Sequence, residues 1–250
     1  MKQPNDVTAA QFQEPAAQKE ITDMLTNALE ILYEDNHIVV CIKPHGIATQ
    51  SRRIGHPDMV SILKNHIHKT GRAKGEPYLA VIHRLDQPVT GILVFAKTPF
   101  AARELNRQLT HQGFGKYYRA LVEGRPPKTQ GTLEHYITKD PRTNLARICS
   151  PSAKDARLAK LHYSIVPKSR SYYSGEYQSR PDVTELEIKL DTGRHHQIRV
   201  QLAHIGCPIV GDTKYNPNSQ SGPAWQTICL CAYRLSFHHP RTRKLLTFHL

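Results

Sequence analysis

Two apolar runs that flank one short polar loop constrain the fold of this chain more than any other feature. The runs occupy residues 79–82 and 91–96, are rich in residues that favour β-strands, and enclose a loop in which Pro88 breaks regular structure. The pattern predicts two buried strands with Asp86 in the loop between them. A nearby guanidinium such as that of Arg84 would keep this carboxylate ionised and available as a nucleophile. Spacing alone favours a simpler alternative, in which Asp86 caps a turn through its own backbone.

Hydrophobic periodicity predicts that helices and strands mix unevenly along the rest of the chain. Apolar residues recur at helical spacing over residues 198–205 and predict a helix of about three turns, with Arg199 at the edge of its buried face. Thr98 followed by Pro99 marks the start of another helix. Strands are predicted at residues 38–42, 117–123, 161–166, 184–190 and 228–233, and helical segments within residues 21–32 and 51–78. Because the chain shows neither an internal repeat nor a regular strand–helix alternation, we expect an α+β fold.

Length and composition predict one compact domain behind an extension. A chain of 250 residues with 39% hydrophobic residues can bury a substantial core. We expect residues 1–28 to form an N-terminal extension that is partly disordered or helical, and residues 29–250 to form the folded domain. No run approaches the roughly 18–20 apolar residues of a membrane span, and no signal peptide is visible. Five cysteines without CxxC spacing complete the expectation of a cytoplasmic protein that does not contact a membrane.

Charge points to a polyanionic partner. The chain carries 34 Lys and Arg against 21 Asp and Glu, a formal net charge of +13. Residues 52–74 and 139–170 are the most basic segments, and their separation suggests a folded surface that follows phosphate groups. The alternative is a basic protein whose charges are merely solvated.

A polar cluster at residues 192–199 and the many histidines could carry further chemistry. The cluster could bind phosphate at a helix start or bring one of its two arginines to a catalytic carboxylate, and a plain surface helix start is an equally good interpretation. The adjacent histidines at 195–196 and 238–239 are expected to point apart on a helix or a strand. Because metal-ligand spacings and glycine-rich phosphate loops are both missing from the sequence, we expect neither a metal nor a nucleotide cofactor.

Four motifs, in order along the chain, resemble those of the RluA-type RNA pseudouridine synthases. Residues 83–97, which contain His-Arg-Leu-Asp, resemble the catalytic loop of that family. The other motifs are an opening strand and Lys-Pro-x-Gly turn at residues 33–46, a Lys-x-Tyr strand at residues 116–124, and a closing block at residues 192–199 and 206–212. The resemblance implies the pseudouridine synthase catalytic fold over residues 29–250, with a mixed, largely antiparallel sheet flanked by helices and loops.

The resemblance also implies roles for individual residues. Asp86 would be the nucleophile, Tyr118 the ring that stacks on the target uracil and assists proton removal at C5, and Arg199 the partner that pairs with Asp86. It further implies four residues that place the loop or bind substrate, namely Arg84, Lys43, Arg194 and Lys116. The target uridine would be flipped out of folded RNA, and the reaction would need neither cofactor nor metal.

The chain departs from the family pattern at a few positions. Gln87 and Thr90 stand where the family often has Arg and Ser, and both keep hydrogen-bonding capacity. His195 replaces a small hydroxyl residue, which changes a local contact with phosphate or base. The N-terminal extension does not resemble the basic S4-type RNA-binding module of many relatives, so RNA choice would rest on the catalytic domain.

The sequence therefore predicts an isomerase that converts specific uridines of structured RNA to pseudouridine. Ribosomal RNA is the favoured substrate and transfer RNA the second, and we expect a monomer whose partner is RNA. The alternative is a non-catalytic RNA-binding or ribosome-assembly protein on the same fold. An RNA-cleaving enzyme that uses histidine pairs is a more distant alternative, because it would not depend on Asp86.

Overall fold

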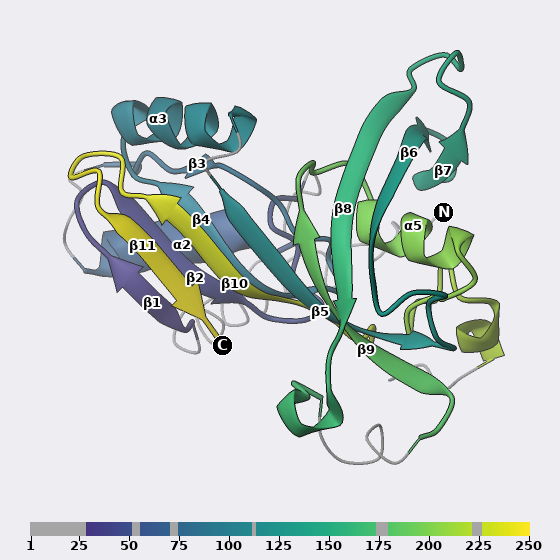
Figure 1. Ribbon diagram of the computed structural model, residues 1–250. Coiled ribbons are helices and arrows are strands. Elements are labelled where there is room, and N and C mark those ends of the chain that lie inside the picture. The colour runs from purple at the N-terminus through teal and green to yellow at the C-terminus, as the bar shows by residue number, and fades with distance from the viewer. Residues whose placement is uncertain (1–28, 52–55, 71–74, 112–113, 174–179, 222–226) are drawn as a thin grey trace, which may run out of the picture.

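A computed structural model describes residues 29–51, 56–70, 75–111, 114–173, 180–221 and 227–250 of the chain (Figure 1). The predicted extension at residues 1–28 lies outside these residues, as do Arg52, Arg53, Arg72 and Lys74 of the first basic segment. The strands are β1 (Ile31–Glu34), β2 (Ile38–Lys43), β3 (Ala80–Val81), β4 (Thr90–Ala96), β5 (Gly115–Glu123), β6 (Gln130–Asp140), β7 (Leu145–Cys149), β8 (Arg157–Ile165), β9 (Val183–Leu190), β10 (Leu230–His238) and β11 (Leu245–His249). The helices are α2 (Met59–Lys69), α3 (Pro99–Thr110) and α5 (Gln197–His204), with 3-10 turns η1 (Lys168–Arg170) and η2 (Pro217–Ser221).

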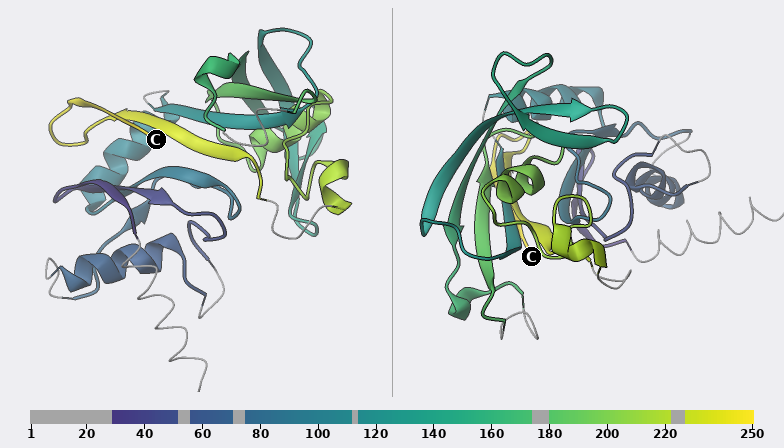
Figure 2. Two further views of the ribbon diagram at one scale, coloured as in Figure 1. Left: turned by 90° about the horizontal axis from the view of Figure 1, so that it is seen from below. Right: turned by 90° about the vertical axis from the view of Figure 1, so that its right-hand side faces the viewer.

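One twisted sheet joins all of these strands, which confirms the predicted α+β class. Its main path runs β1-β2-β4-β10-β5-β9-β8-β6-β7, and β11 and β3 pair with β10 and β4 at its sides. Every pair is antiparallel except β10 with β4, so the sheet is mixed and largely antiparallel, as the resemblance implied. Figure 2 shows that the sheet bends strongly between its two halves.

The first half of the sheet is covered by a helix on each face. Alternate residues of β2 point to opposite sides: Val39 packs with Met59 and Leu63 of α2, and Val40 packs with Leu105 of α3. Burial on both faces explains why β2 and β4 are continuous apolar runs and do not alternate. The Thr98 side chain accepts a hydrogen bond from the Ala101 backbone at the start of α3, which confirms the predicted cap.

Strands β5 to β9 form the second half, and α5 fills its concave side (Figure 1). Ile198 and Leu202 of α5 share a core cluster with Leu186 and Ile188 of β9. Residues 197–202 are all buried, so only the last turn of the helix reaches the surface, and Arg199 lies in the interior and not at an edge as predicted. The helix is also shorter than the predicted three turns, because it begins after His196 and ends before Gly206, both of which have positive φ.

Several sequence predictions were incomplete. Leu32, expected on a helical face, lies in β1, where its strand pairs with the buried β2. The hairpin of β6 and β7 was not predicted, because most of its residues stay partly exposed and give no apolar run. The sequence also did not predict β11, the second strand of the C-terminal hairpin. Its residues alternate between exposed and half-buried, so they form no apolar run.

The two halves meet where β4 runs parallel to β10. Residues Thr90 and Gly91 pair with Cys231 and Ala232 at this seam. Gly91 has a φ of +140°, and a Cβ placed on it would lie 2.4 Å from the Ala232 carbonyl oxygen. Gly91 lies at the start of β4, just after the loop that contains Asp86. This close approach therefore also fixes where that loop joins β4.

Replacing Gly91 by Ala should destabilise the fold strongly. We expect a loss of about 2–5 kcal/mol, since the side chain adds both backbone strain and a collision with β10. Gly46→Ala is the matched control, because Gly46 has a φ of +80° but no atom within 4 Å of its added Cβ. That control should lose about 1 kcal/mol. Urea unfolding followed by circular dichroism measures both, and equal losses would show that the seam is not closely packed.

Candidate active site

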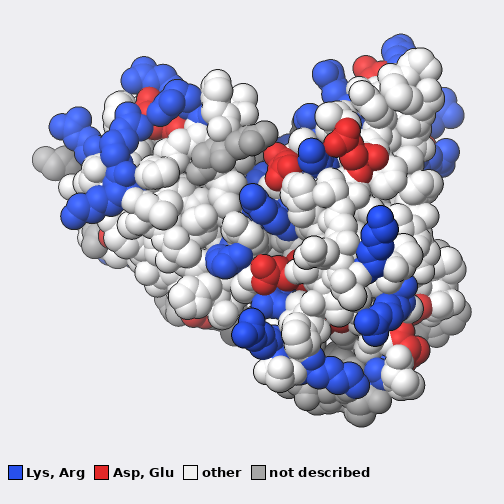
Figure 3. Space-filling model, viewed as in Figure 1, with Lys and Arg blue, Asp and Glu red and all other residues white. Residues whose placement is uncertain are grey.

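A cleft of about 710 Å³ opens over the seam between the two halves of the sheet. Figure 3 shows it as a hollow in which basic and acidic side chains lie together. Of the seven residues implied by sequence, six line this cleft: Asp86, Tyr118, Arg199, Arg84, Arg194 and Lys116. They come from the loop before β4, from β5 and from the start of α5, so the cleft depends on both halves of the sheet.

Lys43 is the seventh residue, and it lies beneath the cleft. Its side chain is fully buried at the end of β2, and its ammonium donates hydrogen bonds at 2.6–2.9 Å to the backbone carbonyls of Pro44, Ile47 and Gln87. Burial lowers the pKa of Lys43 to about 7, and the negative charge of Asp86 opposes this shift. Lys43 therefore attaches the Asp86 loop to the end of β2, and its fully buried side chain does not line the cleft.

The segment after β2 holds the Asp86 loop at further points. Thr49 both accepts from the Leu85 backbone N–H at 3.1 Å and donates to the Leu85 carbonyl at 3.0 Å. The Gly46 N–H donates to the Gln87 carbonyl at 3.0 Å, and the Gln87 side chain donates back to the Gly46 carbonyl at 2.9 Å. Gln87 therefore supports the loop from the position where the family often has Arg.

Arg199 connects Asp86 to a second carboxylate. Its guanidinium donates to both oxygens of Asp212, at 2.8 and 2.7 Å, and to Asp86 Oδ2 at 3.0 Å. Burial alone would lower the pKa of Arg199, but its hydrogen bonds to Asp212 and the charges of both carboxylates raise that pKa above its ordinary value. Asp212 is buried, whereas the Asp86 side chain keeps 27% of its surface exposed. The guanidinium that holds Asp86 is thus that of Arg199 and not that of Arg84.

His196 contacts the same oxygen of Asp86 from the other side. Its Nε2 lies 3.6 Å from Asp86 Oδ2, and its Nδ1 lies 2.7 Å from the Tyr215 hydroxyl. That hydroxyl accepts the Ala146 N–H at 2.7 Å, so it donates its own proton to His196 Nδ1 and leaves the ring proton on Nε2, facing Asp86. Burial lowers the pKa of His196 to about 4 against the charge of Asp86. His196 is therefore neutral at pH 7.

Both contacts to the Asp86 carboxylate fall on Oδ2. Among the described residues, no group donates a hydrogen bond to Asp86 Oδ1. The Asp86 side chain lines the cleft. The turn role that spacing favoured is also present, since the Val89 N–H donates to the Asp86 carbonyl at 2.9 Å. The two interpretations are compatible, because the turn uses the backbone of Asp86 and leaves one carboxylate oxygen available.

Tyr118 lies in β5 with its side chain almost entirely enclosed in the cleft wall. It is 7% exposed, and burial together with the charge of Asp86 raises its pKa well above the ordinary range. The hydroxyl therefore stays protonated near neutral pH. The ring lines the same cleft as Asp86, as the stacking role requires.

The three other implied substrate-binding residues lie at the cleft walls. Arg84 is exposed and has no hydrogen bond or ion pair with any described residue. Arg194 donates to the Leu158 carbonyl at 2.8 Å, and Lys116 lies beside Gly193. Burial lowers the pKa of Lys116, with Asp191 opposing and Arg194 assisting the shift. The arrangement gives the cleft three cationic groups around one available carboxylate oxygen.

Sequence reasoning did not assign roles to Asp212, His196 and Tyr215. Asp212 is the last residue of the closing motif, so the sequence included it in a motif. The sequence did not predict its hydrogen bonds with Arg199. His195 and His196 were expected to diverge, but their rings stack with centroids 3.8 Å apart. The reason is the left-handed backbone of His196, with φ of 51°, which no pattern in the sequence indicates.

One group of possible metal ligands lies together in the described part of the chain: Asp86, His195 and His196, with donor atoms within 4.8 Å of one another. These residues do not suit a metal ion, because the Arg199 guanidinium already occupies Asp86 Oδ2 and would repel a cation. The Tyr215 hydroxyl also occupies His196 Nδ1. The expectation of a site without a metal stays a prediction.

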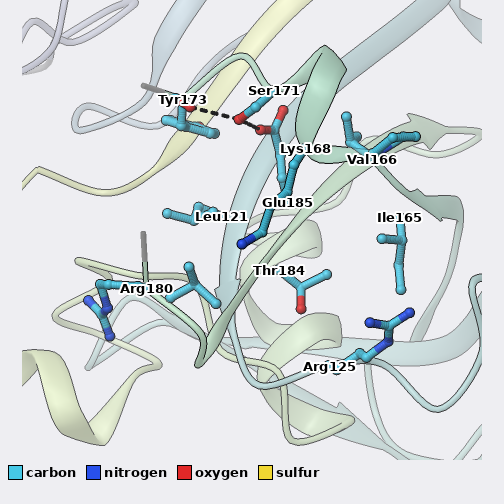
Figure 4. A pocket seen from close by; sticks show the side chains of 12 residues that line it. Leu121, Arg125, Ile165, Val166, Lys168, Ser171, Tyr173, Arg180, Thr184 and Glu185 are labelled. Atoms are coloured by element: carbon cyan, nitrogen blue, oxygen red, sulfur yellow. Dashed lines mark hydrogen bonds between the residues drawn. The ribbon is translucent and has the colours of Figure 1, made fainter. Parts of the chain in front are cut away.

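A second cavity of about 280 Å³ lies at the other end of β5 and β9 (Figure 4). Its carboxylate, Glu185, accepts hydrogen bonds from the Ser171 hydroxyl and the Tyr172 N–H and lies 3.5 Å from Arg119. None of the seven implied residues lines this cavity. Because its carboxylate is satisfied, we place the chemistry in the cleft over the seam.

Comparisons with known proteins identify the family of the chain. A family model described as RNA pseudouridylate synthase matches residues 37–204. The chain is 31% identical to an uncharacterized RNA pseudouridine synthase of Aquifex aeolicus, over 89% of this chain and 69% of that protein. It is 31% identical to the ribosomal large subunit pseudouridine synthase D of Nitrosomonas europaea, over 87% of this chain and 60% of that protein. The chain therefore belongs to the RNA pseudouridylate synthase family, a family of isomerases, as its motifs predicted.

Solved structures agree on the fold. The human RNA pseudouridylate synthase domain containing 4 matches 93% of this chain and 92% of its own, with a TM-score of 0.73 and 21% sequence identity. Human RNA pseudouridylate synthase domain containing 1 matches with a TM-score of 0.68. The predicted pseudouridine synthase fold is therefore confirmed. No helix in the described residues is long and apolar enough to cross a membrane.

The neutral state of His196 predicts a pH effect on stability. Its pKa of about 4 in the folded chain lies below its ordinary value of 6.5, so between these values only the unfolded chain binds the proton. Stability that depends on His196 is therefore present above pH 6.5 and is lost as the pH falls to 4. His196→Asn, which tolerates a left-handed backbone, should lose less stability over that range. Urea unfolding at each pH measures this, and parallel curves for the two proteins would contradict it.

Proposed function

We propose that the chain converts uridine to pseudouridine in structured RNA, with ribosomal RNA as the first candidate substrate and transfer RNA as the second. The observation that carries this proposal is the unequal use of the Asp86 carboxylate. One oxygen is held by Arg199 and His196, and the other remains available in a cleft that also contains the Tyr118 ring. A relative named for the large ribosomal subunit supports ribosomal RNA as the substrate.

The residues around Asp86 suit a reaction that only rearranges bonds within one nucleoside. The N1–C1′ glycosidic bond breaks with the assistance of Asp86, the uracil rotates, and C5 bonds to C1′. C5 then loses its proton, and N1 gains one, so the product is an isomer and no cofactor is consumed. Arg199 holds one oxygen of Asp86 by a hydrogen bond, and the buried Asp212 keeps Arg199 in place.

Tyr118 supplies the ring against which the rotating uracil stacks. A target base inside folded RNA must be flipped out, at a cost of a few kcal/mol that stacking and phosphate contacts offset. Because its hydroxyl stays protonated, Tyr118 would take the C5 proton only through a partner such as water or Asp86.

The second basic segment supports an RNA contact at one side of the cleft. Five of its exposed cations lie on the β6 to β8 arm: Lys139, Arg142, Arg147, Lys154 and Arg157. This arm adjoins the site, since the His195 ring lies 3.1 Å from the Asn144 carbonyl and Arg194 contacts the Leu158 carbonyl. A single RNA could therefore place its uridine in the cleft and its backbone on this arm. The monomeric state, the cytoplasmic location and the independence from a cofactor are further parts of the proposal.

Asp86→Asn should abolish isomerisation while RNA affinity stays within a few fold of the wild type. The amide keeps the size and polarity of the side chain but cannot act as a carboxylate nucleophile. Tritium release from RNA labelled at uracil C5 measures the reaction on ribosomal and transfer RNA transcripts, and filter binding measures affinity. Full activity of the variant would remove Asp86 from the mechanism. If the wild-type protein binds the transcripts tightly but releases tritium from none of them, the RNA-binding alternative is favoured.

Tyr118→Phe separates the ring from the hydroxyl. We expect RNA affinity to stay near that of the wild type, because the stacking surface is unchanged, while the rate of tritium release falls by about 10²-fold or more if the hydroxyl assists proton removal. Single-turnover rates and affinities are measured on the same transcript. A severe loss of binding would contradict the stacking assignment, and an unchanged rate would show that the hydroxyl takes no part.

A further inference from the structure

A basic surface covers α3 and the turn between β10 and β11, on the opposite side of the cleft from the β6 to β8 arm. Figure 3 shows Lys and Arg gathered over these elements, at the upper left of the view. Five exposed cations make up this helix–turn surface, with Glu104 among them: Arg103, Arg107, Arg241, Arg243 and Lys244. Neither basic segment singled out in the sequence contains any of them.

The turn is held rigid from beneath by His239. This buried ring accepts the backbone N–H groups of Arg241 and Thr242 on Nδ1, at 3.2 and 3.0 Å, and its Nε2 donates to Asp35 at 2.7 Å. Arg243 has a φ of 62°, a left-handed conformation that is strained for a residue with a side chain. The turn therefore holds Arg241, Arg243 and Lys244 in fixed positions. Cations that are only solvated would not need a fixed turn.

The turn is also attached to α3. Gln108, which is buried, donates to the His238 carbonyl at 2.8 Å and accepts the His238 N–H at 2.8 Å. Arg243 bridges to Glu104 at 2.6 Å, and Arg107 lies 3.4 Å from the same carboxylate. Helix and turn thus present their charges as one surface, and a single carboxylate leaves most of that charge uncompensated.

The helix–turn surface continues into the cleft. Leu109 and Thr110, in the last turn of α3, line the cleft that contains Asp86. Four of the five cations are arginines, whose planar guanidinium groups suit bidentate contacts with phosphate oxygens. A nucleotide in the cleft is covalently continuous with its neighbours, so the strand that leaves the cleft toward α3 meets this surface.

We propose that the helix–turn surface binds the phosphate backbone of the substrate RNA, so that the RNA spans the cleft and contacts both halves of the fold. The inference rests on the proposed function, because it takes RNA as the ligand. It extends that function by adding a second binding surface, which fixes the direction in which the RNA crosses the cleft.

The test neutralises three of the cations that are not paired with Glu104. The triple variant Arg103→Gln, Arg241→Gln, Lys244→Gln removes three charges from the surface. The matched control removes three exposed charges that lie outside both basic segments and do not line the cleft: Arg125→Gln, Lys128→Gln, Lys189→Gln. Binding to a fluorescein-labelled RNA hairpin is measured by anisotropy at several salt concentrations, and circular dichroism checks that both variants fold.

Each phosphate contact that is lost should reduce the slope of log affinity against log salt by about 1. We expect the slope of the helix–turn variant to fall by about 2 to 3, and the slope of the control to match the wild type. An unchanged slope in the helix–turn variant would overturn the proposal. An equal reduction in both variants would also overturn it, since the effect would then be one of net charge alone.

Tritium release from C5-labelled RNA separates this inference from the proposed function. The wild-type protein could isomerise uridine while the helix–turn variant keeps both the wild-type salt slope and the wild-type KM. The proposal of RNA binding by the helix–turn surface would then be wrong, and the proposed function would be supported. The wild-type protein could instead release no tritium while the salt slope falls in the helix–turn variant and not in the control. RNA binding by the helix–turn surface would then be supported, and the proposed isomerase function would be wrong. If both proposals hold, the variant should show a raised KM for RNA with kcat close to that of the wild type.

Discussion

The buried guanidinium of Arg199 is the interaction on which the rest of the site depends. It joins α5, the Asp86 loop and the turn at Asp212, three segments that are distant in the sequence. A buried arginine is tolerated only when its charge and hydrogen bonds are satisfied, and the buried Asp212 supplies the opposite charge and accepts two of the bonds. Asp86 can therefore remain partly exposed and share the cation without being needed to neutralise it. Asp212 therefore has a structural role, and Asp86 is left for the chemical role that we propose for it.

The same site requires the two halves of the sheet to meet at a fixed distance. Asp86 comes from the half that contains β4, whereas Arg199 and Tyr118 come from the half that contains β5 and α5. The parallel contact of β4 with β10, which only a glycine at position 91 permits, brings these halves together. Lys43 then holds the loop to the end of β2 through three backbone carbonyls. The position of Asp86, the proposed nucleophile, is thus set by backbone packing and backbone hydrogen bonds more than by its own side-chain contacts.

Sequence reasoning was most successful where both faces of an element are buried. Strands β2 and β4 and the loop between β3 and β4 follow from their apolar runs and from Pro88. The motifs pointed to Asp86, Tyr118 and Arg199, which the structure brings together in one cleft, while their roles stay predictions. It was weakest where local pattern carries little information. The β6–β7 hairpin is half exposed, the stacked histidines depend on one left-handed residue, and the burial of Lys43 depends on carbonyl groups from two loops. Those features arise from tertiary contacts, which a single sequence without periodicity does not encode locally.

The titration states of the site also follow from its burial, and they favour one role for each group. His196 is neutral because burial outweighs the attraction of Asp86, so it offers an N–H to the carboxylate without adding charge. Tyr118 stays protonated because burial and the charge of Asp86 act in the same direction. A positively charged histidine beside Asp86 would hold the carboxylate more tightly and reduce its nucleophilicity. The pair of Arg199 and neutral His196 therefore orients Asp86 through one oxygen, and Asp212 largely neutralises the positive charge of Arg199 beside that oxygen.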